Sequence, residues 1–170
     1  MGMIIASHAG DSTLIRVLFV CTGNICRSPT GEGVFRRMIA DAGLDSEVEV
    51  DSCGMEGWHR GNPPDRRAQE HAAKRGYDLS ELRARRLARG DFESFQRIIA
   101  MDAGHLGKLR GLQSAISEAD IRLMMDYAGQ PGVDVPDPYY DGPEAFERAL
   151  DLIEEGCRGL LEEIRADLGR

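Results

Sequence analysis

Long hydrophobic runs are missing from this chain of 170 residues. No apolar stretch approaches the roughly 18 residues that a membrane-spanning helix needs. The first residues, MGMIIASHAGDST, lack the basic segment of a secretory signal, and their apolar stretch is too short for one. Ala6 stands where a myristoylation motif requires serine or threonine. We therefore expect a cytoplasmic protein without a membrane partner, preceded by a mobile leader over residues 1–13.

Basic residues are too few for a nucleic-acid-binding surface. The chain has 29 acidic and 21 basic residues and a net charge of −8, whereas a phosphate backbone is bound by a basic face. Hydrophobic residues make up 42% and charged residues 29%, which is typical of a soluble globular protein. The length suits one core. We predict a single domain over residues 14–170 and no nucleic-acid partner.

Cysteines are few, and their spacing argues against a zinc site. The four cysteines show no paired C-x2-C spacing, and a cytosolic chain of this length needs no disulfide. Cys53 and Cys157 are interpreted as small buried hydrophobic residues. Cys21 and Cys26 belong instead to the stretch 20-VCTGNICRSPT-30. We expect no metal and no cofactor.

Strand and helix patterns alternate along the whole chain. Short apolar, β-rich runs predict strands at 14–20, 48–52, 97–101 and 121–125. Helical spacing predicts helices from Ser28 to Gly43 and over 66–75, 104–112 and 144–168, with Ser28 as the cap of the first and Pro29 in its first turn. This alternation predicts an α/β fold, with a parallel sheet that carries helices on both faces.

Polar or aromatic residues follow each predicted strand. In a parallel sheet the loops after the strands meet at one edge, where ligands bind. The residues expected at that edge are Cys21, Trp58, Asp102, Asp126, Asp134 and Asp137.

The loop after the first strand has the pattern C-x5-R-S, running from Cys21 to Arg27 and Ser28. Backbone N–H groups in such a loop can form a nest for an anion, and the start of the next helix adds partial positive charge. Gly23 and Asn24 tolerate the backbone angles that the turn requires. Arg27 can bind two oxygens of a phosphate. The loop therefore predicts a phosphate site.

The same positive groups favour the thiolate form of Cys21, and Ser28 can donate a hydrogen bond to it. A thiolate below an anion cradle is a nucleophile for phosphorus. The alternative is an ordinary strand-to-helix turn in which Cys21 and Cys26 are buried thiols, because C-x5-R also occurs by chance. The strand before the loop, the glycine within it and the Ser-Pro helix start after it favour the nucleophile.

The motif resembles the active-site loop of the low-molecular-weight protein tyrosine phosphatases. Further similar stretches are DSCGMEGWHRGNPPDRRA, DLSELRARRLARGDF, IIAMD and DVPDPYYDGPEAF, so the resemblance extends from about Ile15 to the end. It implies a doubly wound sheet of four parallel strands. It also implies hydrolysis of phosphotyrosine through a phosphocysteine intermediate, without a metal. Thr22, Gly23, Asn24, Ile25, Cys26 and Ser28 would bind phosphate or support the loop.

A general acid must protonate the leaving group, and we predict Asp137 for this role. Flanking prolines restrain its backbone, and it matches the family's Asp-Pro acid. Asp134 and Asp126 are the alternatives. Trp58, Tyr139 and Tyr140 are expected to form the walls of a slot for an aromatic ring, and His59 is interpreted as a loop residue.

Ile25 favours phosphotyrosine, because relatives similar to arginine phosphatases carry a threonine there and lack the paired tyrosines. Protein arginine phosphatase remains the first alternative. An arsenate reductase is disfavoured, since residues 54–156 contain no cysteine for a disulfide relay. A non-catalytic phosphotyrosine-binding or redox-sensing module is a third alternative. Cys26 could form a reversible, protective disulfide with Cys21.

Cys53, Met55 and His105 depart from the usual family pattern, which would alter the surroundings of the cradle. The expected partner is a phosphotyrosine-containing protein, with a tyrosine kinase among the candidates. The expected assembly is a monomer or weak dimer.

Overall fold

The computed structural model describes residues 14–170, which contain a four-stranded sheet in the order β2-β1-β3-β4. Every neighbouring pair of strands is parallel. The strands are β1 (Ile15–Cys21), β2 (Val48–Gly54), β3 (Arg97–Ala100) and β4 (Asp120–Leu123). The α/β class with a parallel sheet is thereby confirmed.

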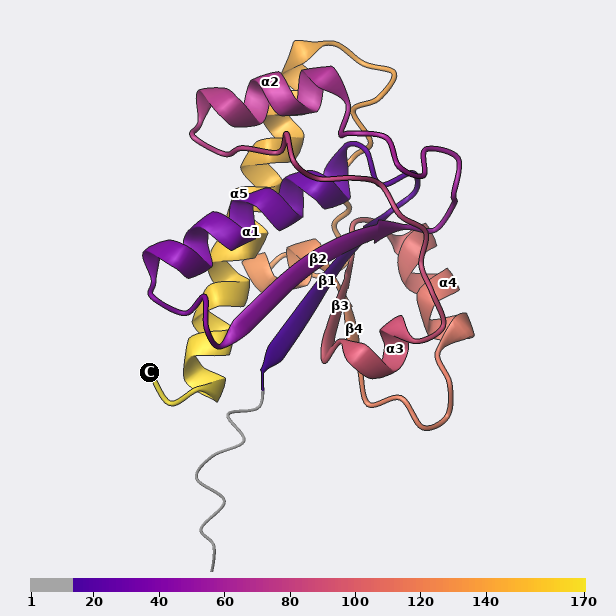
Figure 1. Cartoon of the computed structure of the whole chain (residues 1–170), viewed down its shortest axis with the longest axis vertical. Coiled ribbons are helices and arrows are strands. Elements are labelled where there is room, and N and C mark those ends of the chain that lie inside the picture. The colour runs from indigo at the N-terminus through magenta and orange to yellow at the C-terminus, as the bar shows by residue number, and fades with distance from the viewer. Residues whose placement is uncertain (1–13) are drawn as a thin grey trace, which may run out of the picture.

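Helices cover both faces of the sheet (Figure 1). They are α1 (Arg27–Asp41), α2 (Arg66–Lys74), α3 (Asp91–Ser94), α4 (Ala103–Leu112), the 3-10 helix η1 (Met124–Ala128) and α5 (Pro143–Asp167). Strand β1 alternates between two cores. Val17 and Phe19 pack with α1 and α5, whereas Leu18 and Val20 pack with Phe92 of α3 and the α4 side. Both faces of β1 are buried, as its continuous apolar run predicts.

The end of the fourth strand and one short helix differ from prediction. The fourth strand ends at Leu123 and not at Met125, because η1 begins at Met124. Both methionines are buried against α5, so the apolar run continues into a helix and not into the sheet. The short helix α3 was not predicted.

The prediction that Ser28 caps the first helix is wrong. Helix α1 begins at Arg27, and Cys26 occupies the cap position without a side-chain hydrogen bond. The Ser28 hydroxyl instead lies 3.0 Å from the Cys21 sulfur and 3.2 Å from the Cys53 carbonyl. The Ser28 side chain therefore contacts the end of β1 and β2 and does not cap helix α1.

Cys53 and Cys157 are completely buried, as predicted for small hydrophobic residues, and burial raises the pKa of both thiols. Among the helices of residues 14–170, none combines the length and apolar character that crossing a membrane requires. The predicted leader, residues 1–13, lies outside the described residues.

Candidate active site

The loop from Cys21 to Ser28 connects β1 to α1 at the carboxyl edge of the sheet. Cys21 is the last residue of β1, pairs with Gly54 at the end of β2 and is 3% exposed. Asn24 has a φ of 57°, a conformation that asparagine tolerates better than most residues. A Cβ on Gly54 would lie 2.8 Å from the Thr22 carbonyl oxygen, so a glycine lets β2 close against the loop.

The backbone of this loop is polarised. Its carbonyls at Cys21, Thr22 and Ile25 accept hydrogen bonds of 2.7–2.9 Å from backbone amides in the segment between β2 and α2. Within residues 14–170, no acceptor is bonded to the four consecutive amides from Gly23 to Cys26. Carbonyls bonded outward and amides left available make a cradle with partial positive charge. Such a cradle suits the oxygens of a phosphate group.

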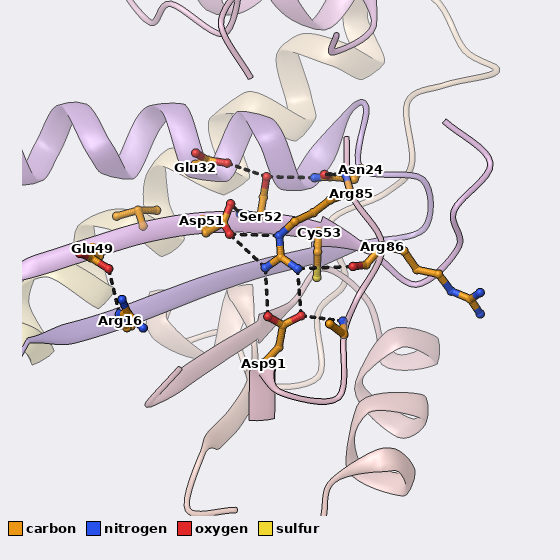
Figure 2. Close-up of polar contacts among 12 residues, drawn as sticks. Arg16, Asn24, Glu32, Glu49, Asp51, Ser52, Cys53, Arg85, Arg86 and Asp91 are labelled. Atoms are coloured by element: carbon orange, nitrogen blue, oxygen red, sulfur yellow. Dashed lines mark hydrogen bonds and ion pairs between the residues drawn. The ribbon is translucent and has the colours of Figure 1, made fainter. Parts of the chain in front are cut away.

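A chain of hydrogen bonds supports the Cys21 sulfur from below. Its contact with Ser28 is held by Asn24, whose side-chain amide donates to Ser28 Oγ at 2.7 Å and to Ser52 Oγ at 2.9 Å. Ser52 in turn donates to Glu32 at 2.7 Å. Figure 2 shows the part of this chain from Asn24 through Ser52 to Glu32. Asn24 donates to the Ser28 oxygen, so the one hydroxyl hydrogen of Ser28 has two acceptors within reach, the Cys21 sulfur at 3.0 Å and the Cys53 carbonyl at 3.2 Å.

The acidic end of that chain, Glu32, is buried inside α1. Burial raises the pKa of its carboxyl group, although hydrogen bonds from Ser52 and the charge of Arg36 act in the opposite direction. A buried carboxylate is stable only when it is well bonded. Glu32 therefore fixes Ser52, and through it Asn24.

Arg85 anchors the loop from the other side (Figure 2). Its backbone N–H donates to Asn24 Oδ1 at 3.0 Å, and its guanidinium lies 3.0 Å from both Asp51 and Asp91. The sequence indicated only a basic connection over residues 79–90. Arg85 was missed, because its carboxylate partner Asp51 is 34 residues away in the chain.

Arg27, the first residue of α1, is 4% exposed and lines the same site. One nitrogen of its guanidinium, Nη1, donates to Asp102 at 2.8 Å and to the Val135 carbonyl at 2.9 Å. Burial acts to raise the pKa of Asp102, but hydrogen bonds from the His105 amide and from Arg27 outweigh it and lower that pKa. These contacts orient the guanidinium, whose other nitrogen, Nη2, lies 3.7 Å from Asp137.

Asp137 comes to the cavity from the loop before α5, and it is partly exposed. Its Oδ1 accepts a hydrogen bond of 3.1 Å from the Tyr139 amide. The two alternatives for the general acid bind backbone amides elsewhere. Asp134 accepts from Ala103 at 2.9 Å at the start of α4, and Asp126 accepts from Leu123 at 3.2 Å in η1. Neither is among the residues that line the cavity.

The cavity has a volume of about 240 Å³. The lining residues are Cys21, Thr22, Gly23, Ile25, Cys26, Arg27, Trp58, His59, Asp137, Tyr139 and Tyr140. Trp58 and Tyr140 are 72% and 90% exposed, so they stand at the mouth, while the cysteine and arginine are buried at the base. The Tyr139 and Tyr140 rings meet edge to face with centroids 4.8 Å apart. The shape is a slot with aromatic rims and a polar floor.

Two histidines, His59 and His105, lie next to the cradle, and their contacts there were not predicted from the sequence. His59, interpreted as a loop residue, also lines the cavity, and its Cδ2 lies 2.9 Å from the position of a Cβ on Gly23. His105 lies behind the cradle with Nε2 2.8 Å from Thr22 Oγ1. Its departure from the family pattern was the only signal for His105, because Thr22 is 83 residues away.

The sequence matches a known protein family over almost its whole length. The family model for low molecular weight phosphotyrosine protein phosphatase matches residues 16–170. The Bacillus subtilis low molecular weight protein-tyrosine-phosphatase YfkJ is 42% identical over 155 residues, which cover 91% of this chain and 98% of the relative. The human low molecular weight phosphotyrosine protein phosphatase is 37% identical over 148 residues, 86% of this chain and 93% of the relative.

Solved structures agree with the fold. The crystal structure of YfkJ superposes with a TM-score of 0.85 at 41% identity, covering 93% of this chain and 99% of that chain. A Drosophila arginine phosphatase superposes with a TM-score of 0.84 at 30% identity, covering 89% and 98%.

Proposed function

We infer the mechanism of this protein from one premise: the chain belongs to the low-molecular-weight phosphotyrosine protein phosphatase family. It is a protein-tyrosine-phosphatase, and it hydrolyses phosphotyrosine in phosphoprotein substrates. The observation that carries the residue assignment is the convergence of Cys21, Arg27 and Asp137 on one cavity.

In the first step, the Cys21 thiolate attacks phosphorus opposite the tyrosine oxygen. A sulfur–phosphorus bond forms while the phosphorus–oxygen bond breaks, and the protonated carboxyl of Asp137 gives its proton to the departing phenol oxygen. General acid catalysis of this kind contributes typically about 10²–10⁴-fold. The product is a phosphocysteine, and Asp137 is left as a carboxylate.

In the second step, that carboxylate takes a proton from a water molecule whose oxygen attacks phosphorus. The sulfur–phosphorus bond breaks, the thiolate is restored and inorganic phosphate leaves. The same Asp137 serves both steps because its side chain is accessible from the cavity and restrained by the Tyr139 amide.

Charge on the transferred phosphoryl group is stabilised by the amides from Gly23 to Cys26 and by Arg27. The contacts of Arg27 with Asp102 and Val135 occupy one guanidinium nitrogen and fix the plane of the group. Ser28 stabilises the thiolate, both as the nucleophile and as the leaving group of the second step.

The aromatic walls and Ile25 select the substrate. Trp58, Tyr139 and Tyr140 offer ring faces and edges to a phenyl ring. Ile25 lines the cavity and, like Tyr139, packs against the buried cluster of Cys26, Ala68 and Phe146. It therefore offers an apolar surface where a threonine would offer a hydroxyl. Phosphoarginine hydrolysis is the alternative activity, favoured by the likeness to the Drosophila arginine phosphatase.

We also propose a cellular setting for the enzyme. We place the enzyme in the cytoplasm, where thiols such as Cys21 stay reduced. Residues 14–170 would act as one catalytic domain, as a monomer or weak dimer, and a tyrosine kinase that carries phosphotyrosine is one candidate substrate.

The test is phosphate release from a phosphotyrosine peptide and from phosphoarginine, measured for wild type, Cys21→Ser and Ile25→Thr. We expect wild type to prefer phosphotyrosine, Cys21→Ser to release nothing, and Ile25→Thr to shift the ratio of kcat/KM values towards phosphoarginine. A wild-type preference for phosphoarginine would keep the mechanism and overturn the specificity. Full activity of Cys21→Ser would overturn the mechanism.

A further inference from the structure

His105, the third residue of α4, is 5% exposed and faces the back of the phosphate cradle. Its Nε2 lies 2.8 Å from the hydroxyl of Thr22, the residue that directly follows Cys21. Its backbone N–H donates to Asp102 Oδ1 at 2.9 Å. The other oxygen of that carboxylate holds Arg27. His105 thus contacts Thr22, beside the nucleophile Cys21, and Asp102, which orients Arg27.

The second ring nitrogen of His105 is a buried polar atom that lacks a hydrogen-bond partner within residues 14–170. This Nδ1 lies 3.2 Å from Asp102 Oδ1, in a geometry that is not a hydrogen bond. A buried polar atom without a partner is destabilising, and its retention at a site calls for a reason. Asp102 also supplies a negative charge, which favours a hydrogen on the facing nitrogen. Nε2 is then the acceptor, and the Thr22 hydroxyl donates to it.

Protonation would change this arrangement. Both nitrogens of a histidinium are donors, so the Thr22 hydroxyl would have to turn away from Nε2. The charged groups that act on the ring are Arg27 from α1, Asp102 at the start of α4, Lys108 on α4 and Asp137 from the acid loop. Burial lowers the pKa of His105, Arg27 and Lys108 lower it further, and the two carboxylates only partly oppose them. The neutral ring is therefore the form present near neutral pH.

We propose that His105 is a positioning residue of this phosphatase: through Thr22 and Asp102 it holds the nucleophile side and the arginine side of the cradle in one geometry. The proposal rests on the phosphatase function given above. His105 touches neither substrate nor the reacting atoms, so its effect reaches the reaction through Thr22 and Arg27. The backbone N–H of residue 105 makes the hydrogen bond to Asp102, whereas the imidazole ring makes the contact with Thr22. The histidine therefore links two parts of the cradle and adds a titratable group.

A double-mutant cycle separates this role from simple packing. His105→Gln removes the titratable ring, Thr22→Val removes only the hydroxyl, and the double variant removes both. Residues in one hydrogen-bond network couple by roughly 2- to 100-fold, so each single change should lower kcat/KM by about 10-fold. The double variant should be no worse than the poorer single variant. Lys108→Gln is the matched control, because it changes an exposed charge that acts on His105 without touching the cradle.

The pH profile gives the second readout. The ratio of wild-type to His105→Gln kcat/KM should be largest above the ordinary histidine pKa of about 6.5, and it should fall towards one as the pH drops below that value and His105 becomes protonated. Imidazole nitrogen NMR of the wild type should show Nδ1 as the protonated nitrogen of the neutral ring. The proposal would be overturned if the losses of the two single variants multiplied in the double variant. It would also be overturned if the ratio of wild-type to His105→Gln kcat/KM did not change with pH. Either result would leave the phosphatase function intact. Loss of wild-type turnover on phosphotyrosine would instead overturn the proposed function. If His105→Gln does not fold, the pH profile and kcat of the isosteric Thr22→Val decide the question, since its ratio to wild type must fall with pH in the same way.

Discussion

The side-chain amide of Asn24 donates to Ser28 Oγ at 2.7 Å and so fixes that oxygen 3.0 Å from the Cys21 sulfur. Asn24 also occupies the left-handed backbone region, with φ of 57°, at the point where the loop curls around the cradle. One residue thus sets both the path of the backbone and the position of the hydroxyl oxygen beside the nucleophile.

Substitution of Asn24 separates these two roles. Asn24→Gly keeps the backbone conformation and removes the amide, whereas Asn24→Ala removes both. A hydrogen bond to a charged group is worth about 1.5–3 kcal/mol, so kcat should fall by roughly 10- to 100-fold in both variants. Urea unfolding should show Asn24→Ala to be less stable than Asn24→Gly by about 1 kcal/mol. Wild-type kcat in Asn24→Gly would contradict the role assigned to the amide.

Asp137 should matter most for substrates whose leaving group needs a proton. Asp137→Asn should lower kcat on a phosphotyrosine peptide by about 10²–10⁴-fold. The loss should be smaller on an aryl phosphate with a more acidic phenol, because that leaving group needs less protonation. Asp134→Asn is the control: Asp134 accepts from the Ala103 amide, so its change should lower stability and leave the leaving-group dependence unaltered. Equal losses for both phenols in Asp137→Asn would argue against a general acid.

Asp102 links stability to pH. Its folded-state pKa is lowered, so its contribution is present above the ordinary aspartate pKa and is lost as the pH falls through the folded value. Asp102→Asn should therefore lower the free energy of unfolding at neutral pH by about 1–3 kcal/mol. The difference from wild type should shrink below about pH 4. A difference that stays constant over that pH range would show that the carboxylate charge is not its source. Loss of the Arg27 contact should also lower kcat.

Oxidation of Cys21 should be reversible because Cys26 lies in the same cavity. Cys21 and Cys26 line the same cavity, and burial, followed by the charge of Asp65, raises the pKa of the Cys26 thiol. Peroxide would convert the Cys21 thiolate to a sulfenic acid, which condenses with the Cys26 thiol to give a disulfide and water. Peroxide-treated wild type should regain activity with dithiothreitol, whereas Cys26→Ser should not. Cys157→Ala, with its change at a distant buried thiol, should recover like wild type. Failure of wild type to recover would end the hypothesis.

Local patterns predicted most of the elements, because buried strands and amphipathic helices have periodic signals within a few residues. The run from Leu14 to Val20 predicted β1, and C-x5-R-S predicted a strand-to-helix loop that the structure contains. The run Ile121–Met125 misled the prediction of β4, because an apolar run alone does not distinguish a strand from the buried face of η1.

The side-chain contacts that hold the cradle in place could not be predicted from local sequence patterns. The contacts of Arg85 with Asp51 and of His105 with Thr22 join residues that are 34 and 83 positions apart. Such pairs are set by how the strands are ordered in the sheet, and no local pattern encodes them. Ser28 shows the converse: its sequence context is that of a helix cap, but its hydroxyl bonds to a sulfur seven residues earlier.

The covalent intermediate is the central claim, and trapping it is the most direct measurement. Asp137→Asn would be mixed with an aryl phosphate whose phenol leaves without a proton, denatured rapidly and mapped by peptide mass spectrometry. We predict a phosphoryl group on Cys21, a burst of phenol that matches the enzyme concentration, and neither in a Cys21→Ser variant. Continued turnover without an adduct on Cys21, or an adduct on another residue, would contradict the account.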